Sequence, residues 1–183
     1  GVLSDTAHFR VNIGNQPPTA HAGGPYTGTE GGLLNFNGSG STQGDGGPLQ
    51  YRWDFGDGSP WTTWNASDTA SHTYLDEGTG QYTLTLQVTN DIGISSDQTM
   101  VTVSNVNPTV DAGGPYPAFA SESVSVIASG GDVGVNDVLE YRFDFGVGWS
   151  SWGQTTTVSH TYATTGAKTV HVEVRDGDGV TGA

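Results

Sequence analysis

The sequence contains two copies of one pattern, and this repeat constrains the fold more than any other feature. The matching motifs are Ala-Gly-Gly-Pro-Tyr at 22–26 and 112–116, Tyr-Arg-(Trp/Phe)-Asp-Phe-Gly at 51–56 and 141–146, and His-Thr-Tyr at 72–74 and 160–162. The first two pairs are separated by 90 residues and the third by 88. Because the order is kept while small loop deletions change the offset, the chain consists of two copies of one domain.

Each copy has the pattern of β-strands with one buried face. Apolar residues alternate with polar ones in three segments: Leu84, Leu86 and Val88; Val124 and Val126; Val170, Val172 and Val174. A period of two is typical of half-buried strands. Clusters of Gly, Ser, Asp and Pro at 39–41 and 44–48 indicate turns between strands. About seven short strands in about 90 residues predict an all-β fold of two sandwiches.

The motifs resemble those of the PKD (polycystic kidney disease) domain. The resemblance rests on two co-linear sets of Pro-Thr-x-x-Ala-Gly-Gly-Pro-Tyr, the Asp-Phe-Gly signature and His-Thr-Tyr, and it covers essentially the whole chain. It implies two tandem immunoglobulin-like β-sandwiches in an extracellular or cell-surface protein. It implies no catalysis, because PKD domains serve as spacers, adhesion modules or accessory modules beside secreted enzymes.

The second copy departs from the signature of the first. Phe143 stands where the first copy has Trp53, and Val147 stands where it has Asp57. Tyr82 opens a late strand of the first copy, where a tyrosine-corner hydroxyl ties down a loop. Its counterpart is Lys168, so we expect this tie to be lost in the second copy.

The two ends of the chain do not match a whole number of domains. Phe9, Val11 and Ile13 precede the first Pro-Thr motif in the same register as the last strand of the first copy. The predicted organisation is therefore 1–14, the last strand of a preceding or neighbouring domain; 15–106, the first PKD-like domain; and 107–183, a second PKD-like domain without its final strand. A sandwich without an edge strand exposes backbone polar groups and part of its core.

Several arrangements would complete the second domain. The sequence can be one period of a longer chain, in which residue 183 continues into a segment like 1–14. Alternatively, 1–14 of one copy can complete the next copy by donor-strand complementation, with Phe9, Val11 and Ile13 as the polymer contact. Such a head-to-tail contact can extend into a filament. Completion within one chain is disfavoured, since 1–14 leads directly into the first domain, and an arbitrarily cut piece would show the same ends.

Clustered carboxylates are the one metal signal in the sequence. Calcium prefers oxygen ligands from Asp-rich loops, and some PKD domains bind calcium near the Asn-Pro entry and the Asp-rich turn. By this resemblance the expected ligands are Asp45, Asn107, Asp132 and Asp137. The spacing is not that of an EF-hand, and Asp is also common in turns that bind no metal.

Other polar and aromatic motifs have structural and functional interpretations. Asn37 and Asn65 begin glycosylation sequons. Trp-x-x-Trp pairs occur at 61–64 and 149–152, either as caps of the cores or as a contact for sugar or a neighbouring domain. His72 and His160 occupy matching positions in the repeats, which favours a structural role, and no nucleophile and orienting acid stand at a recognisable spacing from them.

Composition excludes further classes of function. Five Lys and Arg oppose 19 Asp and Glu, giving a formal net charge of −14, which disfavours nucleic acid and anionic membranes as partners. No segment is apolar enough to span a bilayer, and the chain has no cysteine. We expect a non-catalytic extracellular repeat that builds a fibre, stalk or surface sheath. The alternative is an adhesion or carbohydrate- or protein-binding accessory module of a larger protein.

Overall fold

The computed structural model describes Gly1, residues 14–177 and residues 181–182. Thirteen strands form the regular secondary structure of these residues, which confirms the all-β prediction. Among them there is no helix with the length and apolar character that a membrane crossing needs.

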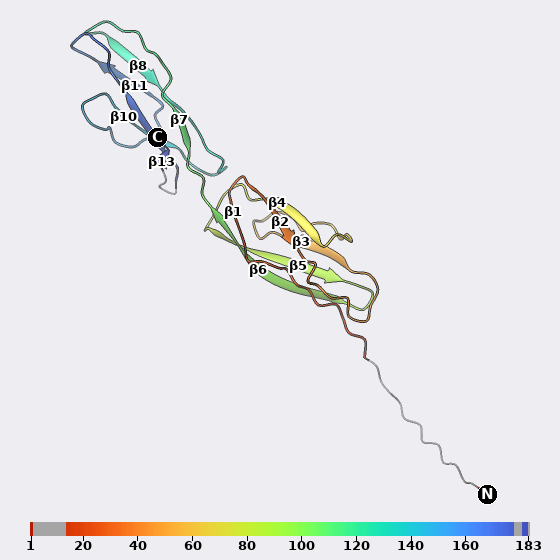
Figure 1. The fold of residues 1–183 in the computed structure, drawn as a ribbon. Helices are drawn as coiled ribbons and strands as arrows, with labels where there is room; N and C mark the ends of the chain where they lie inside the picture. Colours follow the sequence, from red (N-terminus) through yellow and green to blue (C-terminus); the bar gives the residue numbers. More distant parts are fainter. Residues whose placement is uncertain (2–13, 178–180, 183) are drawn as a thin grey trace. The chain divides into compact units, whose positions relative to one another are not determined.

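Figure 1 shows the strands of both repeats, with labels where there is room. The first repeat contains β1 (Tyr26–Thr29), β2 (Leu33–Asn37), β3 (Gln50–Asp54), β4 (Thr69–Thr73), β5 (Gln81–Thr89) and β6 (Ile94–Ser104). The second contains β7 (Thr109–Asp111), β8 (Ser123–Ile127), β9 (Ser129–Gly131), β10 (Glu140–Asp144), β11 (Thr157–Thr161), β12 (His171–Arg175) and β13 (Thr181–Gly182).

The chain forms two compact units whose bounds differ from those of the repeats. One unit comprises residues 1–25, 35–71 and 83–100, and the other comprises 26–34, 72–82 and 101–183. The second unit therefore contains the second repeat together with the β1–β2 turn and the β4–β5 loop of the first repeat.

Equivalent strands pair in the same register in both repeats. In the first repeat Tyr51 lies opposite Val88, and Trp53 lies opposite Leu86. In the second, β10 and β12 form the corresponding antiparallel pair. There Tyr141 lies opposite Val174 and Phe143 opposite Val172. Position 86 of the first repeat therefore corresponds to position 172 of the second, and the two copies share one fold.

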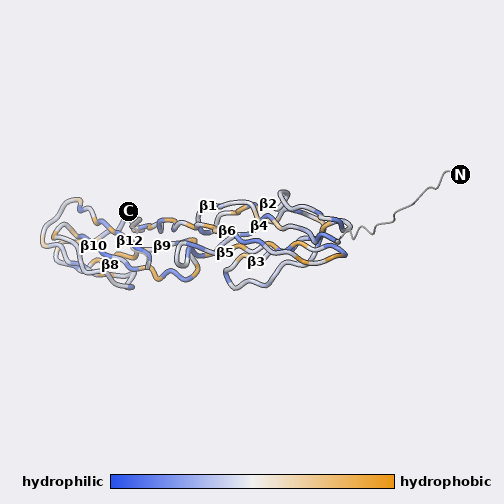
Figure 2. The backbone as a smooth tube through the Cα atoms, turned by 90° about the horizontal axis from the view of Figure 1, so that it is seen from below, coloured by the Kyte–Doolittle hydropathy of each residue, from blue (hydrophilic) through white to orange (hydrophobic). Residues whose placement is uncertain are grey.

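The alternating strands bury every second residue, as the sequence predicts. Leu84, Leu86 and Val88 of β5 are each 0% exposed. β6 adds two more buried side chains, Val101 and Val103. Figure 2 shows hydrophobic stretches in orange and hydrophilic stretches in blue along the backbone. Removing these apolar side chains from water is the main favourable term in folding.

The second repeat has its own core, assembled from the same strands. Its buried members are Val126, Ala128, Tyr141, Phe143, Val172 and Val174. Half-buried apolar residues pack against this core. They include Ala112, Tyr116 and Val170. Two of them, Ala112 and Val170, correspond to Ala22 and Leu84, which are fully buried in the first repeat.

The tyrosine corner is present in the first repeat only. Tyr82 Oη donates a hydrogen bond to the Asp76 carbonyl at 2.7 Å. The Tyr82 ring stacks on Tyr74 with centroids 4.5 Å apart. At the equivalent position Lys168 Nζ donates instead to Thr164 Oγ1 at 3.0 Å. The tyrosine hydroxyl is therefore lost as predicted, but Lys168 replaces its tie, because Thr164 is the counterpart of Asp76 in the loop.

Candidate strand-binding groove

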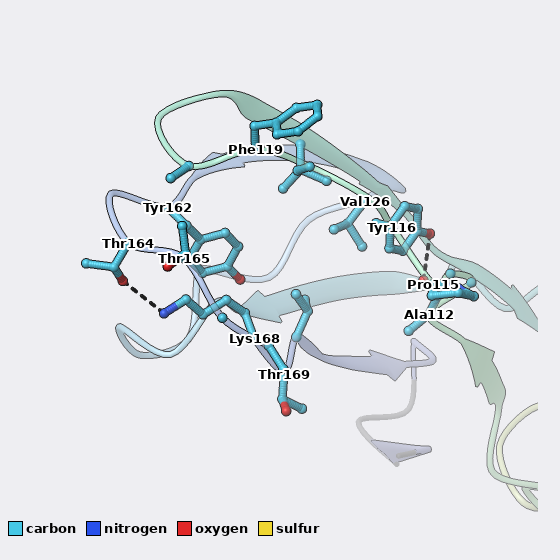
Figure 3. Close-up of a pocket in the computed structure, with 18 residues that line it drawn as sticks. Ala112, Pro115, Tyr116, Phe119, Val126, Tyr162, Thr164, Thr165, Lys168 and Thr169 are labelled. Carbon is cyan, nitrogen blue, oxygen red and sulfur yellow. Dashed lines mark hydrogen bonds between the residues drawn. The ribbon is translucent and has the colours of Figure 1, made fainter.

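The second repeat contains a groove of about 540 Å³ along one side of its core. Two segments, 112–120 and 162–170, provide most of its lining, and Val124 and Val126 of β8 complete it. Figure 3 shows Tyr162 and Lys168 at one end of the groove and Tyr116 with Ala112 at the other. The lining combines apolar side chains with backbone that belongs to no strand.

One side of the groove corresponds to β1 of the first repeat. There β1 pairs in parallel with β6, with Tyr26 opposite Val101 and Gly28 opposite Val103. The offset of 90 residues places Tyr116 and Ala118 at the positions of Tyr26 and Gly28. Both Tyr116 and Ala118 line the groove.

The other side corresponds to the beginning of β5. In the sheet order of the first repeat, β6 lies between β1 and β5. The register of β10 and β12 makes Val170 the equivalent of Leu84. Leu84 is fully buried, whereas Val170 is half-buried and lines the groove. The groove therefore occupies the position that β6 fills in the first repeat.

Other equivalent pairs show the same loss of cover. Ala22 is 0% exposed and its counterpart Ala112 is half-buried. Tyr74 is 1% exposed and its counterpart Tyr162 is half-buried. The hydroxyl oxygen of Tyr162 is shielded from water and has no hydrogen-bond partner, so a polar group entering the groove would satisfy it.

Hydrogen bonds hold the rim of the groove in place. Tyr116 Oη donates to the Ala112 carbonyl at 2.8 Å and accepts from the Ile127 N–H at 3.1 Å. Figure 3 draws the first of these bonds and the bond between Lys168 and Thr164. Hydrogen bonds therefore anchor Tyr116 on one side of the groove and Lys168 on the other.

β13 is the described part of the strand that corresponds to β6. It pairs with β12, with Gly182 opposite Val174 and Thr181 opposite Arg175. These two residues match Ser95 and Ser96 near the beginning of β6. The sequence-predicted contact residues Phe9, Val11 and Ile13 lie outside the described residues, so their role stays a prediction.

The predicted calcium ligands fall into different parts of the structure. Asp45 belongs to the first unit, where its carboxylate accepts a hydrogen bond from the Gln16 N–H at 2.8 Å. Asn107, Asp132 and Asp137 belong to the second unit, and Asn107 is exposed. Asp132 Oδ1 accepts from the Val133 N–H at 2.6 Å, and Oδ2 is buried without a hydrogen-bond partner. The second unit therefore contains oxygens that suit a hard cation.

Asp137 lies beside two acidic residues that the sequence analysis did not single out. Carboxylate oxygens of Glu30, Glu77 and Asp137 all lie within 4.8 Å of one another. Both glutamates precede glycines in turns. Only the fold brings these distant segments together.

Comparisons with known proteins agree with the repeat structure. The family model described as PKD domain matches residues 15–104 and again residues 105–183. The chain belongs to the PKD domain family. The PKD resemblance drawn from the motifs is thereby confirmed. The exact boundaries at 106 and 107, and the separate status of 1–14, stay predictions.

Two curated proteins contain segments similar to these PKD repeats. Human polycystin-1 is 33% identical over 118 residues, which cover 63% of this chain and 3% of that protein. The collagenase ColQ1 of Bacillus cereus (strain Q1) is 38% identical over 92 residues, covering 50% of this chain and 9% of that protein. Among solved structures, the PKD domain of an M14-like peptidase from a Thermoplasmatales archaeon is 23% identical, with a TM-score of 0.35. It covers 49% of this chain and 99% of that chain.

The Trp-x-x-Trp pairs of both PKD repeats clamp arginine side chains. The Arg52 guanidinium lies 4.7 Å and 4.6 Å from the ring centroids of Trp61 and Trp64. Arg142 lies 4.6 Å from both Trp149 and Trp152 and forms an ion pair with Glu173. Each arginine thus stacks on two aromatic faces. These contacts test neither predicted role, the cap of the core or the contact for sugar or a neighbouring domain, so both stay predictions.

The turn after β10 concentrates hydrogen bonds on one carboxylate. The N–H groups of Gly146 and Gly148 donate to Asp144 Oδ1 at 2.8 Å and 2.9 Å. These donors lower the pKa of Asp144 below its ordinary value of 3.8, because they favour the charged form. The carboxylate serves to hold this turn.

The histidines and sequons of the PKD repeats also have structural contacts. His72 packs edge-on against Tyr74 with centroids 4.9 Å apart, and His160 stacks on Phe145 at 4.6 Å. Asn37 and Asn65 are exposed, and each side chain accepts the backbone N–H two residues later. Glycosylation at these two positions stays a prediction.

Proposed function

We propose that the chain is a non-catalytic structural repeat of an extracellular fibre, stalk or surface sheath. In this proposal a strand with the sequence pattern of residues 1–14, supplied by the adjoining segment, fills the groove of the second repeat. The observation that carries it is the groove itself, which lies where the first repeat holds β6.

The sequence of 1–14 matches the strand that the groove lacks. At an offset of 90, Val11 and Ile13 correspond to Val101 and Val103, which are 0% and 2% exposed. The register of β1 and β6 would then set Val11 opposite Tyr116 and Ile13 opposite Ala118. Burying each such side chain contributes about 1.5–3 kcal/mol, and the backbone of the added strand would gain ladder hydrogen bonds.

The strand can come from the same long chain or from a second copy. In a covalent tandem array the next repeat follows directly and brings its strand with it. In strand exchange the contact joins different surfaces of two copies, so it does not close and propagates as a filament. The net charge of −14 would keep either assembly hydrated.

The comparisons support a second candidate function. The matching segments make up only 3% and 9% of the two relatives. In this reading the chain is an adhesion or carbohydrate- or protein-binding accessory module of a larger secreted or cell-surface protein. Such a module would bind one preferred ligand as a monomer.

Addition of the strand in trans tests the structural proposal. A variant that lacks residues 1–14 keeps the groove and cannot donate a strand. We expect a peptide with the sequence of residues 1–14 to bind this variant and to raise the melting temperature of its second repeat by at least about 5 °C. Calorimetry in the presence and absence of the peptide measures both effects.

Two controls make this experiment specific. A peptide with Phe9, Val11 and Ile13 replaced by Ser should not bind, whereas one with Arg10 and Asn12 replaced by Ser should bind as the unmodified peptide does. Ala118→Arg places a long side chain in the groove at an exposed position and should abolish binding. Equal binding by both altered peptides would contradict the proposal.

A further inference from the structure

Three carboxylates converge in the second unit. Glu30 lies in the β1–β2 turn, Glu77 in the β4–β5 loop, and Asp137 in the loop between β9 and β10. One oxygen of each is shielded from water. One carboxylate oxygen from each of the three residues lies within 4.8 Å of those of the other two. Opposite ligands of one calcium ion, at 2.3–2.6 Å from the metal, are about 5 Å apart, so the three oxygens fit in one coordination sphere.

Glu30 supplies an independent sign of a missing cation. Its side chain belongs to a residue that is only 2% exposed. Oε1 accepts a hydrogen bond from the Val106 N–H at 2.8 Å, while Oε2 has no hydrogen-bond partner. A buried carboxylate oxygen without a donor is costly unless a positive charge compensates it.

The segments around Glu30 contribute further oxygens without donors. Asn105 precedes the residue that binds Glu30, and its Oδ1 is buried and unpartnered. Asp132 Oδ2 is also buried and unpartnered. Asp132 Oδ1 accepts weakly from Gly134, whose N–H lies at 3.4 Å. Buried acceptors thus gather on the same segments, whereas a stable fold pairs such groups.

Gly134 gives the carboxylates room to approach. A Cβ at this position would collide with the Asp137 carboxylate and would lie 2.7 Å from Glu30 Oε2. The glycine is buried. Because glycine has no Cβ, Gly134 leaves space directly beside two of the three carboxylates.

The second repeat shows that the turns do not need these acids. Ser121 adopts the same left-handed conformation as Gly31, with φ of 70° and 66°. The Ser121 N–H donates to the Tyr162 carbonyl at 2.8 Å, as the Gly31 N–H does to the Tyr74 carbonyl. Yet Ala120 stands at the position of Glu30, and Thr165 at that of Glu77. The paired acids thus serve something other than turn formation.

The described basic side chains are engaged with other groups. Arg52 lies between two tryptophans, Arg142 pairs with Glu173, and Arg175 pairs with Glu140. We propose that Glu30, Glu77 and Asp137 bind a calcium ion, which joins two turns of the first repeat to a loop of the second. This site differs from the set expected from sequence and does not depend on the strand-completion proposal.

Calcium titration of the full chain and of a Glu30→Gln variant tests the site. We expect the wild-type chain, freed of metal by a chelator, to bind calcium in isothermal titration and to melt at a higher temperature with calcium. Glu30→Gln should weaken this binding at least about 10-fold. Magnesium should bind more weakly, since it accepts only a smaller octahedral shell.

The sign of the stability change distinguishes a cation site from a packing role. Without calcium, Glu30→Gln should melt at a higher temperature than wild type, because it removes one of three repelling charges. With calcium the order should reverse. A simple packing defect would lower stability in both conditions.

Matched variants complete the test. Glu122→Gln, an exposed glutamate near the equivalent turn of the second repeat, should leave calcium binding unchanged. Glu77→Gln should repeat the effect of Glu30→Gln and provides a second variant if the first does not fold. Unchanged calcium affinity in both Glu30→Gln and Glu77→Gln would overturn the proposal. The proposal would also be overturned if the wild-type chain bound no calcium and its melting temperature rose only at lower pH. That result would indicate that the carboxylates share a proton.

Discussion

At the scale of single residues, one hydroxyl group distinguishes the two repeats. Tyr82 ties the loop after β4 through its bond to the Asp76 carbonyl, whereas Lys168 bonds to the side chain of Thr164, the counterpart of Asp76. The loop held by Tyr82 also carries Glu77. The tyrosine corner therefore holds the loop that carries one of the proposed cation ligands.

We expect Tyr82→Phe to lower the free energy of unfolding of the first repeat by about 1 kcal/mol, because one intramolecular hydrogen bond is lost. Tyr82→Leu should cost more, since it also removes the ring that stacks on Tyr74. Chemical denaturation followed by tryptophan fluorescence measures both. Equal stability of Tyr82→Phe and wild type would show that the bond to Asp76 contributes nothing.

At the scale of elements, β6 is the strand that decides whether a repeat is closed. It lies between β1 and β5 and buries Val101 and Val103. In the second repeat the same position is a groove, although strands β8, β10, β11 and β12 are formed. In the described part of the second repeat, the core residues of these strands lie beside this groove.

Two matched valines test the equivalence of β6 and the segment 1–14. Val101→Ala should destabilise the first repeat by about 2 kcal/mol, from lost burial and the cavity that remains. Val11→Ala should leave the melting of a monomeric chain unchanged and should weaken association between copies by about 10-fold or more. Calorimetry and sedimentation measure the two effects. If Val11→Ala destabilised the monomer as strongly as Val101→Ala, the strand would belong to its own chain.

At the scale of the whole molecule, the proposed fibre requires PKD repeats that follow one another head to tail. The pattern that begins each repeat is preceded in both cases by a strand-like segment, at 9–13 and at 99–103. Head-to-tail contacts between such units do not have to close into a ring. Covalent linkage and strand exchange differ in the length of the polypeptide.

The mass of the source material separates these arrangements. A single very large chain after full denaturation is expected for covalent repeats. A denatured mass near 19.0 kDa with a native polymer is expected for strand exchange. If both the native and the denatured mass were near 19.0 kDa, the fibre proposal would fail, and the accessory-module function would take its place.

Local patterns in the sequence were sufficient for the fold. The alternation of Leu84, Leu86 and Val88 predicts their burial because the side chains of a strand point to opposite faces in turn. The repeated motifs predict two like sandwiches because equal patterns make equal contacts. Tyr82 and Lys168 could be compared directly, since both stand at one position of the same pattern.

The cation site was not predictable in this way. The sequence analysis selected Asp132 and Asp137 by their loop and missed Glu30 and Glu77. Each glutamate is followed by glycine in an ordinary turn. One signal was available, since the second repeat replaces both acids with Ala120 and Thr165.

The sequence by itself determined the strands and the repeat, because these depend on local periodicity and on comparison of one copy with the other. Only the tertiary structure decided that a groove lies at the position of β6 and that Glu30, Glu77 and Asp137 converge. Such convergence depends on how distant segments pack, and no local pattern records which turns will meet in space.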